Sequence, residues 1–390
     1  MILKKTFVFG KRRLTPHAII LFTLCLISFN GLMAQSKWKA KDLYLEPSFS
    51  YGRLIGTEDD AANLINYSSY NVAISFGKQT TGEKDWEKYF NCPDYGLTFK
   101  YGTSNHHFHT NRFALFGYIN GRFYQKANFG LTYKMGFGMS FWTNVYDEVT
   151  NPQNIYIGSV LNCHLHMELG TYFRIAKNAD LTCALLISHS SNGAVVLPNR
   201  GANGFALQVG YRHHLNERMP INKEFDVKPT FYPKNSLYFN IGPGVLESRK
   251  GGTLATHFAN TLQIGYARMF NPKFRYGAGI DLMYSTEILM MLPEEERDAW
   301  KAFNTAAYAS FDILYNRFTV HLAFALYTYR AFEYDKVFTP YYERVGVKYQ
   351  FGKERNHSAG ICMKVHYGSI DYIEWTYGFQ FYNWYDKRGK

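Results

Sequence analysis

Beyond its N-terminal region, the sequence lacks any long hydrophobic run. No segment there reaches the roughly 18–20 consecutive apolar residues that a membrane-spanning helix needs, so helical spans are excluded. Cysteine is scarce, with 5 residues among 390, and the spacing of these residues matches no metal motif. Basic residues give a formal net charge of +12. They are scattered along the chain, however, which excludes a nucleic-acid-binding patch.

Aromatic residues and glycine are abundant instead. The chain has 32 Tyr, 32 Phe and 32 Gly, and aromatics make up 18% of it. Apolar and polar residues alternate with a period of two along most of the sequence, which is typical of β-strands. Strands with one apolar and one polar face suit a barrel wall between lipid and a polar lumen. We therefore predict an all-β protein, a transmembrane antiparallel β-barrel of the outer-membrane type. A soluble lipid-binding β protein is the alternative.

Residues 1–34 have the pattern of a secretory signal peptide. An apolar run at 18–32 ends at Met33-Ala34-Gln35, where Ala34 is a small residue suited to cleavage. Five basic residues precede the run, namely Lys4, Lys5, Lys11, Arg12 and Arg13. An N-terminal membrane anchor is the alternative, but the run is short for a full span. The segment predicts export, which agrees with an outer-membrane location.

The alternation predicts about 16 strands in two groups of eight, one within 35–215 and one within 236–390. A polar, proline-containing stretch at 216–235 separates them as a linker or long loop. One barrel of about 14–16 strands is our preferred arrangement. Two eight-stranded barrel-like halves are the alternative, because residues 184–211 and 323–349 share a strand–turn–strand pattern that suggests a divergent repeat.

Three local features complete the predicted secondary structure. The sixth strand of the first group should span 156–174. Glu83 and Glu87 are expected in a solvated loop between strands. A helix is predicted from Pro293 to Phe303, because proline suits the first helical position and the glutamates that follow it favour a helix N-terminus.

One segment combines polar residues with a face that should meet lipid. Residues two apart in a strand share a face, so His189 and Ser191 lie on the same side as Leu185 and Ile187. In the next strand, Asn203 begins an apolar row of alternate residues up to 211. Polar groups at the end of an outer apolar face are costly unless they have a function.

A His and a Ser on one face suit acyl transfer. A serine hydroxyl is a weak nucleophile until a base takes its proton, and His189 is near enough to Ser191 to be that base. A third polar group fixes the imidazole tautomer. Asn192, with backbone N–H groups near Gly193, is a candidate for stabilising the oxyanion. A lipid-facing site predicts an ester substrate that lies in the membrane, and this mechanism demands no metal or other cofactor.

The motif that carries these residues resembles a known family. His189-x-Ser191-Asn192, then Pro198-Asn199-x-Gly201, then a polar residue opening an alternating strand, is similar to PagL, the outer-membrane lipid A deacylases. The resemblance covers roughly 43–215 and is specific over about 189–211. It implies an eight-stranded barrel with a Ser–His–acid triad on its outer surface, which hydrolyses the acyl ester at the 3-position of lipid A.

The resemblance implies a role for each matched residue. Ser191 would be the nucleophile and His189 the base. Asn192, Gly193 and Asn199 would form or support the oxyanion hole. The family's acid falls at Asn203, which can orient an imidazole but supplies no negative charge. Activity is therefore expected to be weaker, differently tuned or absent, and residues 236–390 make the chain longer than the small barrel of the family.

Other histidines and acids have less specific patterns. His164, His166 and Glu168 alternate on a face that should line the lumen, on the wrong side of the wall to complete a triad with His189. Their spacing of about 7 Å along a strand is wide for a shared metal ion. The cluster at residues 106–109 is expected in an exposed loop. The polar lumen row and the extra strands also suit a non-enzymatic, porin-like or structural barrel.

Overall fold

The computed structural model describes residues 42–55, 67–105, 111–216, 234–248, 254–330, 340–366 and 369–382. The predicted signal peptide and the histidine cluster at 106–109 lie outside these ranges. In the described part of the chain, no helix is long and apolar enough to span a membrane.

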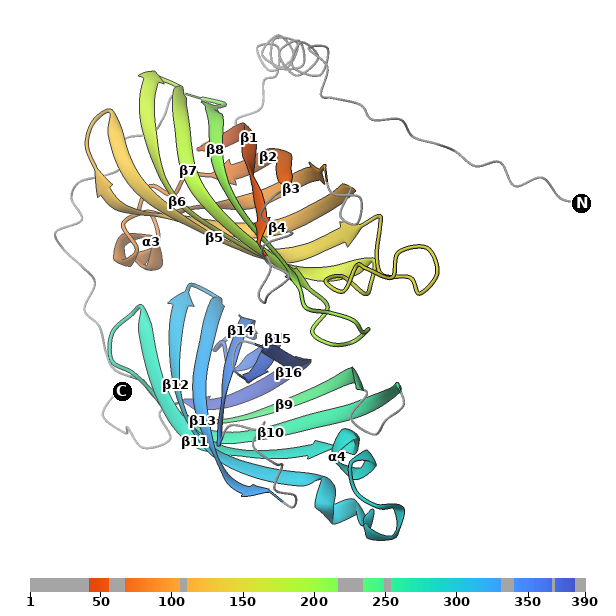
Figure 1. The fold of residues 1–390 in the computed structure, drawn as a ribbon. Helices are drawn as coiled ribbons and strands as arrows, with labels where there is room; N and C mark the ends of the chain where they lie inside the picture. Colours follow the sequence, from red (N-terminus) through yellow and green to blue (C-terminus); the bar gives the residue numbers. More distant parts are fainter. Residues whose placement is uncertain are drawn as a thin grey trace, which may run out of the picture. The chain divides into compact units, whose positions relative to one another are not determined.

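The first eight strands pair antiparallel in chain order, and the eighth returns to the first (Figure 1). They are β1 (Leu43–Ile55), β2 (Ser68–Lys78), β3 (Asp94–Ser104), β4 (Asn111–Gln125), β5 (Phe129–Trp142), β6 (Leu161–Ala176), β7 (Ala179–Ser191) and β8 (Ala202–His214). The β1–β8 pairing closes this sheet into an eight-stranded barrel, which leaves no open edge.

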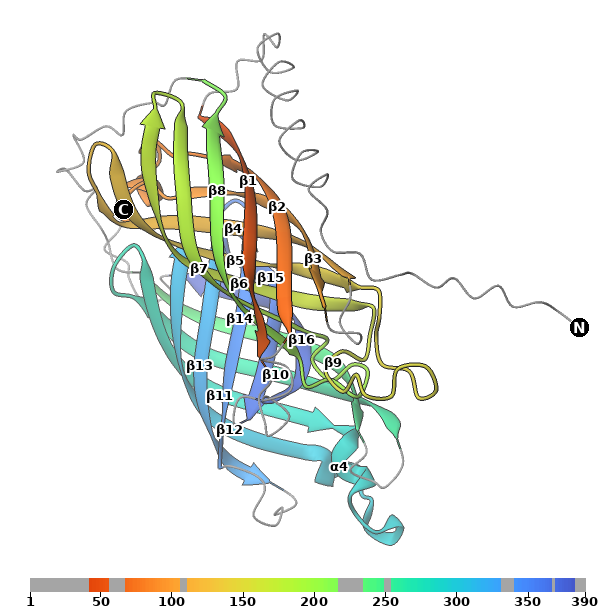
Figure 2. The same cartoon turned by 45° about the horizontal axis from the view of Figure 1, so that its top comes forward.

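The second eight strands close in the same way, because β16 pairs with β9 (Figure 2). They are β9 (Asn235–Ser248), β10 (Ala255–Met269), β11 (Phe274–Ser285), β12 (Phe303–Tyr315), β13 (Phe318–Arg330), β14 (Tyr341–Phe351), β15 (His357–His366) and β16 (Ser369–Tyr382). The predicted class, an antiparallel barrel of the outer-membrane type, is confirmed.

The arrangement into one large barrel, which we preferred, is wrong. The structure has the alternative, two closed barrels of eight strands. The physical reason is that alternation is a local signal. It identifies each strand and the face that each residue takes, but it does not determine whether the eighth strand pairs with the ninth or with the first.

Each barrel has an apolar outer wall and a lumen that contains paired charges. Arg212 lies 2.9 Å from Glu46 and 3.1 Å from Asp94 in the first barrel. In the second, Arg344 lies 2.6 Å from Asp281 and 2.8 Å from Glu374. Buried charges are costly unless they are paired, so these contacts make a polar core compatible with folding.

The two barrels share one cross-strand row. In the first, Tyr44, Gly77, Gly96 and Tyr118 are register partners across β1 to β4, and the two phenol oxygens lie 2.8 Å apart. A Cβ at Gly77 would come within 2.3 Å of Tyr118 Oη, so glycine leaves the space that the phenol occupies.

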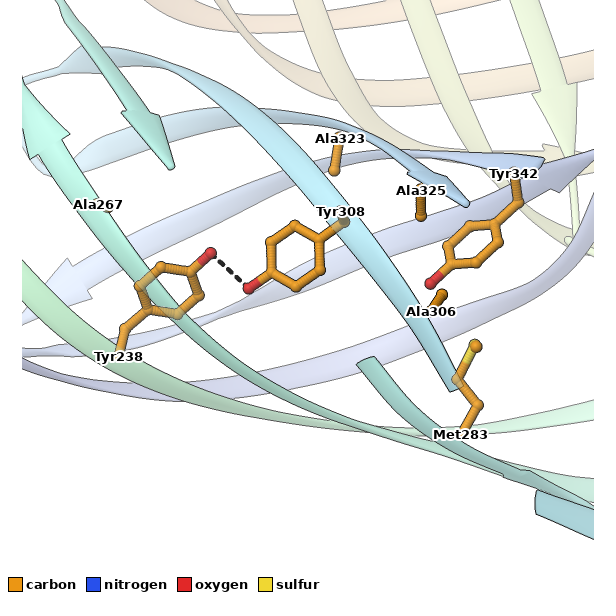
Figure 3. Packing of buried hydrophobic residues seen from close by; sticks show 8 residues of the cluster. All are labelled: Tyr238, Ala267, Met283, Ala306, Tyr308, Ala323, Ala325 and Tyr342. Carbon is orange, nitrogen blue, oxygen red and sulfur yellow. Dashed lines mark hydrogen bonds between the residues drawn. The ribbon is translucent and has the colours of Figure 1, made fainter. Parts of the chain in front are cut away.

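The second barrel has the same row across β9 to β12. It consists of Tyr238, Gly265, Gly279 and Tyr308, with the phenol oxygens 2.6 Å apart (Figure 3). The shared row aligns strands β1–β4 of the first barrel with β9–β12 of the second. Because both barrels continue in chain order, β7–β8 then correspond to β15–β16. The repeat proposed from residues 184–211 and 323–349 would instead match β7–β8 with β13–β14, so its offset is corrected.

Three local predictions also need correction. The segment predicted as one helix has two short 3₁₀ turns instead, η2 (Glu294–Glu296) and η3 (Ala299–Ala302), and a short helix, α4 (Thr286–Met290), precedes it. Residues 293–300 are exposed, so a longer helix would have no apolar face to bury. Glu87 is not solvated but buried in helix α3 (Asp85–Tyr89), where its carboxylate accepts the N–H of Gly82 at 3.0 Å. Residues 156–160, expected in β6, belong to the preceding loop.

Candidate active site on the outer wall

The candidate residues lie where β7 ends and β8 begins. His189 and Asn203 are direct register partners on these strands. Leu185, Ile187 and Leu207 on the same face are 44%, 56% and 58% exposed, whereas the lumen residue Leu186 is 1% exposed. These residues therefore lie on the outer face of the barrel, and Leu186 lies on the lumen face.

His189 is oriented by an amide. Its Nδ1 lies 2.7 Å from Oδ1 of Asn203. An amide oxygen only accepts hydrogen bonds, so Nδ1 carries the proton and donates it. Nε2 is then left with a lone pair, which is the tautomer that a general base requires.

Ser191 lies close to two hydrogen-bond donors. Its Oγ accepts Nδ2–H of Asn199 at 2.8 Å and the backbone N–H of Gly193 at 3.2 Å. The side chain is on the outer wall, but only 4% of the residue is exposed. Both Ser191 and His189 are described, and no hydrogen bond joins them. The structure therefore brings together His189 with Asn203, and Ser191 with Gly193 and Asn199, as two separate groups.

Asn192 has a different place from the one predicted. Its Nδ2 donates to Ser159 Oγ and to the carbonyl of Val196, both at 2.9 Å. The side chain thus braces the loop rather than facing the nucleophile. Its backbone N–H donates to Oδ1 of Asn199 at 3.2 Å, which turns Nδ2 of Asn199 toward Ser191.

A loop that the sequence analysis did not assign to the site supports this arrangement. Residues 143–160 connect β5 and β6, and Tyr156 and Ile157 pack with Trp142 in a buried cluster. The Tyr156 carbonyl accepts the N–H of Gly201 at 2.9 Å, and the Ile155 carbonyl accepts the N–H of Arg200 at 3.2 Å. The apolar residues Tyr156 and Ile157 are the available signal, but their pattern predicts the start of a strand.

Gly201 lies against the imidazole. A Cβ built at this position would lie 2.5 Å from Cε1 and 3.2 Å from Nε2 of His189. Its φ of +76° also favours glycine. The motif glycine therefore leaves room for the edge of the ring that would act as the base.

The lumen row of β6 lies behind this wall, as predicted. Glu168 is paired with Lys134 at 3.2 Å and with His166 at 2.7 Å, and it also accepts from Gln208. It does not contact His189. Nowhere in the described chain do three or more His, Cys, Asp or Glu residues form a group suited to a metal ion.

Comparison with known proteins relates both barrels to one family. Residues 70–212 match the family model for lipid A 3-O-deacylase (PagL), and residues 233–384 match the acyloxyacyl hydrolase C-terminal domain of the same family name. Both barrels are PagL-like. No curated protein matches the chain.

Three solved structures are among those similar to this chain. The outer membrane enzyme PagL is 14% identical, covers 42% of this chain and 97% of its own, and gives a TM-score of 0.33. Neisserial surface protein A is 10% identical, covers 44% of this chain and 97% of its own, and gives a TM-score of 0.33. A mutant of the Rh. blastica porin is 8% identical, covers 87% of this chain and 100% of its own, and gives a TM-score of 0.17.

Proposed function

We propose that this protein is an exported outer-membrane serine esterase that removes an ester-linked acyl chain from lipid A. The family match supports lipid A deacylation in the outer membrane. The serine esterase mechanism is supported by one group of residues on the outer wall, namely His189, Asn203, Ser191 and Asn199. Membrane-embedded lipid A would reach this group sideways, and residues 1–34 would direct export and then be removed.

The chemistry follows the order of an acyl transfer. Nε2 of His189 takes the Ser191 proton as Oγ attacks the ester carbonyl, and the carbonyl π electrons move onto oxygen. Gly193 N–H and Asn199 Nδ2–H, which now bond Oγ, are near enough to donate to that oxyanion. The imidazolium then protonates the lipid A oxygen as its bond to the carbonyl carbon breaks. Water, deprotonated by His189, attacks the carbonyl carbon of the acyl-serine. The imidazolium returns that proton to Ser191 Oγ as the bond from Oγ to the acyl group breaks, and the fatty acid is released.

Substrate binding must change one contact before this sequence can start. Ser191 has to rotate toward His189, because its Oγ is bonded to Asn199 and Gly193. Catalytic hydrogen bonds commonly tighten only in the substrate complex. The two side chains lie at alternate positions of one strand and so share a face.

Mass spectrometry of lipid A tests the proposal. Cells that produce the wild-type protein should yield lipid A lacking one acyl chain, and Ser191→Ala should abolish that change. Ser190→Ala is the matched control, because Ser190 faces the lumen and bonds His164 at 3.0 Å. It should preserve deacylation. Identical acyl patterns for wild type and Ser191→Ala, with both proteins folded in the membrane, would refute the esterase.

The porin-like alternative fits the lumen less well. The ionic groups around Arg212 and Arg344 cross the interior of their barrels and are almost fully buried. Paired side chains that fill an eight-stranded lumen leave little room for solute passage. Planar-bilayer recordings should therefore show no stable channels, and a steady ionic conductance would favour the porin-like function.

A further inference from the structure

The lumen of the first barrel contains a cavity of about 30 Å³ whose lining includes cations and no carboxylate. Lys100 on β3, Arg112 on β4 and His164 on β6 border it. Arg53 also lines it, and the remaining polar lining residues are neutral, among them Ser69, Asn71, Ser140, Ser188 and Ser190. The cavity lies behind the wall that carries the candidate active site, and the proposed esterase does not use it.

Lys100 is a buried lysine in a cavity that no carboxylate lines. The residue is 5% exposed, and it makes no hydrogen bond or ion pair within the part of the chain that the structure describes. Lysines are almost never buried in this way unless they are paired, because the loss of hydration is not compensated. Its surroundings therefore call for a negatively charged or strongly accepting species.

Arg112 and His164 have further unsatisfied donors at the same cavity. Nη2 of Arg112 donates to two neutral acceptors, Ser69 Oγ and Asn71 Oδ1. The other terminal nitrogen, Nη1, is buried with no partner. His164 Nδ1 lies 3.0 Å from Ser190 Oγ, and its Nε2 is buried with no partner. If Nδ1 accepts from the serine, Nε2–H is a donor that lacks an acceptor.

Neighbouring acids do not relieve this imbalance. Glu168 is also in the lumen, but it does not line the cavity and is engaged by Lys134, His166 and Gln208. The second barrel offers a contrast. Its cavity of about 20 Å³ includes Asp312, which lies 2.7 Å from both Arg275 and His321.

We propose that the first barrel binds a small monovalent inorganic anion of about the size of chloride among Lys100, Arg112 and His164. The cavity volume suits one or two water-sized species, which excludes a lipid phosphate group. An anion there would accept from the free donors of Arg112 and His164 and would neutralise the buried ammonium of Lys100. Water alone would satisfy the donors without neutralising the two cations.

Thermal unfolding of the purified full chain in detergent tests the site. Sodium chloride, bromide and gluconate are compared at equal ionic strength, because gluconate is too large for the cavity. We expect Tm to be about 2–4 °C higher in chloride and bromide than in gluconate. Lys100→Met should remove this difference. Lys134→Met is the control, because Lys134 is a buried lysine already paired with Glu168; it should lower Tm in every salt and keep the difference.

Crystals grown in bromide give a readout that needs no variant. An anomalous peak is expected among Lys100 Nζ, Arg112 Nη1 and His164 Nε2. Equal Tm values in the three salts together with no bromide peak would show that water fills the cavity and would overturn the proposal. A salt difference that persists in folded Lys100→Met would also overturn it, because the anion would then act elsewhere.

Discussion

His189 Nδ1 lies 2.7 Å from Oδ1 of Asn203, its direct cross-strand partner. This contact fixes the ring and its tautomer as a carboxylate would, but without a negative charge to stabilise the imidazolium that forms during catalysis. Orientation and charge, which are combined in a Ser–His–acid triad, are thus separated in this chain. Substitution at position 203 can measure each contribution.

Asn203→Glu should raise kcat, because it keeps an acceptor near Nδ1 and adds the missing charge. Asn203→Leu should lower kcat by about 100-fold, since the ring loses its tautomer control. Lipid A deacylation rates in detergent micelles measure both. If Asn203→Leu were as active as the wild type, the contact would have no part in the reaction.

Asn199 should act through its donor nitrogen. Asn199→Asp keeps an oxygen to accept the Asn192 N–H but cannot donate to Ser191 Oγ. We expect it to lose about 100-fold to 1000-fold in kcat with little change in KM, as when an oxyanion-hole donor is removed. Asn199→Gln restores an amide donor at this position, so it tests whether kcat recovers relative to Asn199→Asp. A rise in KM alone would instead indicate a role in lipid binding.

Gly201→Ala should inactivate the enzyme while leaving the barrel intact. The new methyl group would overlap the Cε1–Nε2 edge of His189, and the positive φ adds strain. Gly117→Ala on β4 is the matched control, because its Cβ would meet only a carbonyl oxygen at 3.8 Å. The control should keep both activity and Tm. Full activity in Gly201→Ala would mean that the ring edge is not used.

The sequence predicted those parts of the fold that depend on local patterning. Alternation identified the strands and the outward direction of His189, because the side-chain period of a strand is the same in any barrel. Closure was missed, since it depends on pairing between β1 and β8, which no local pattern records. The repeated Tyr–Gly–Gly–Tyr row would have been the sequence clue, but its residues are 14 to 33 positions apart.

The candidate site was predictable in part for a related reason. The motif supplied His189, Ser191 and Asn203, whose relation follows from strand register. The direction of the Asn192 side chain depends on Ser159, from a loop that is distant in sequence. Tyr156 and Ile157 looked like the beginning of a strand because apolar residues are buried equally well by a loop that packs on Trp142. Loop packing of this kind is a tertiary property.

Cys92 should resist alkylation at neutral pH. Burial is the main effect that raises the pKa of its thiol, to about 11, and Glu87 acts in the same direction. At pH 8 the thiolate fraction would be about 1 in 1000, and the thiolate is the reactive form. Iodoacetamide labelling followed by peptide mass spectrometry should show slow modification in the folded protein and rapid modification in denaturant. Rapid labelling of folded protein at pH 8 would contradict the burial of this thiol.

Arg212→Met should destabilise the first barrel by about 3–5 kcal/mol, because Glu46 would remain buried without its guanidinium partner. Asp94 retains Arg122 at 2.5 Å, so the loss falls mainly on Glu46. Urea unfolding followed by tryptophan fluorescence measures the change.

Adding Glu46→Gln to Arg212→Met should recover part of the lost stability, since it removes the unpaired charge while keeping the shape of the side chain. Lys126→Met, at an exposed position, should change stability by no more than about 0.5 kcal/mol. If the double variant were no more stable than Arg212→Met, lost packing rather than the unpaired carboxylate would account for the effect.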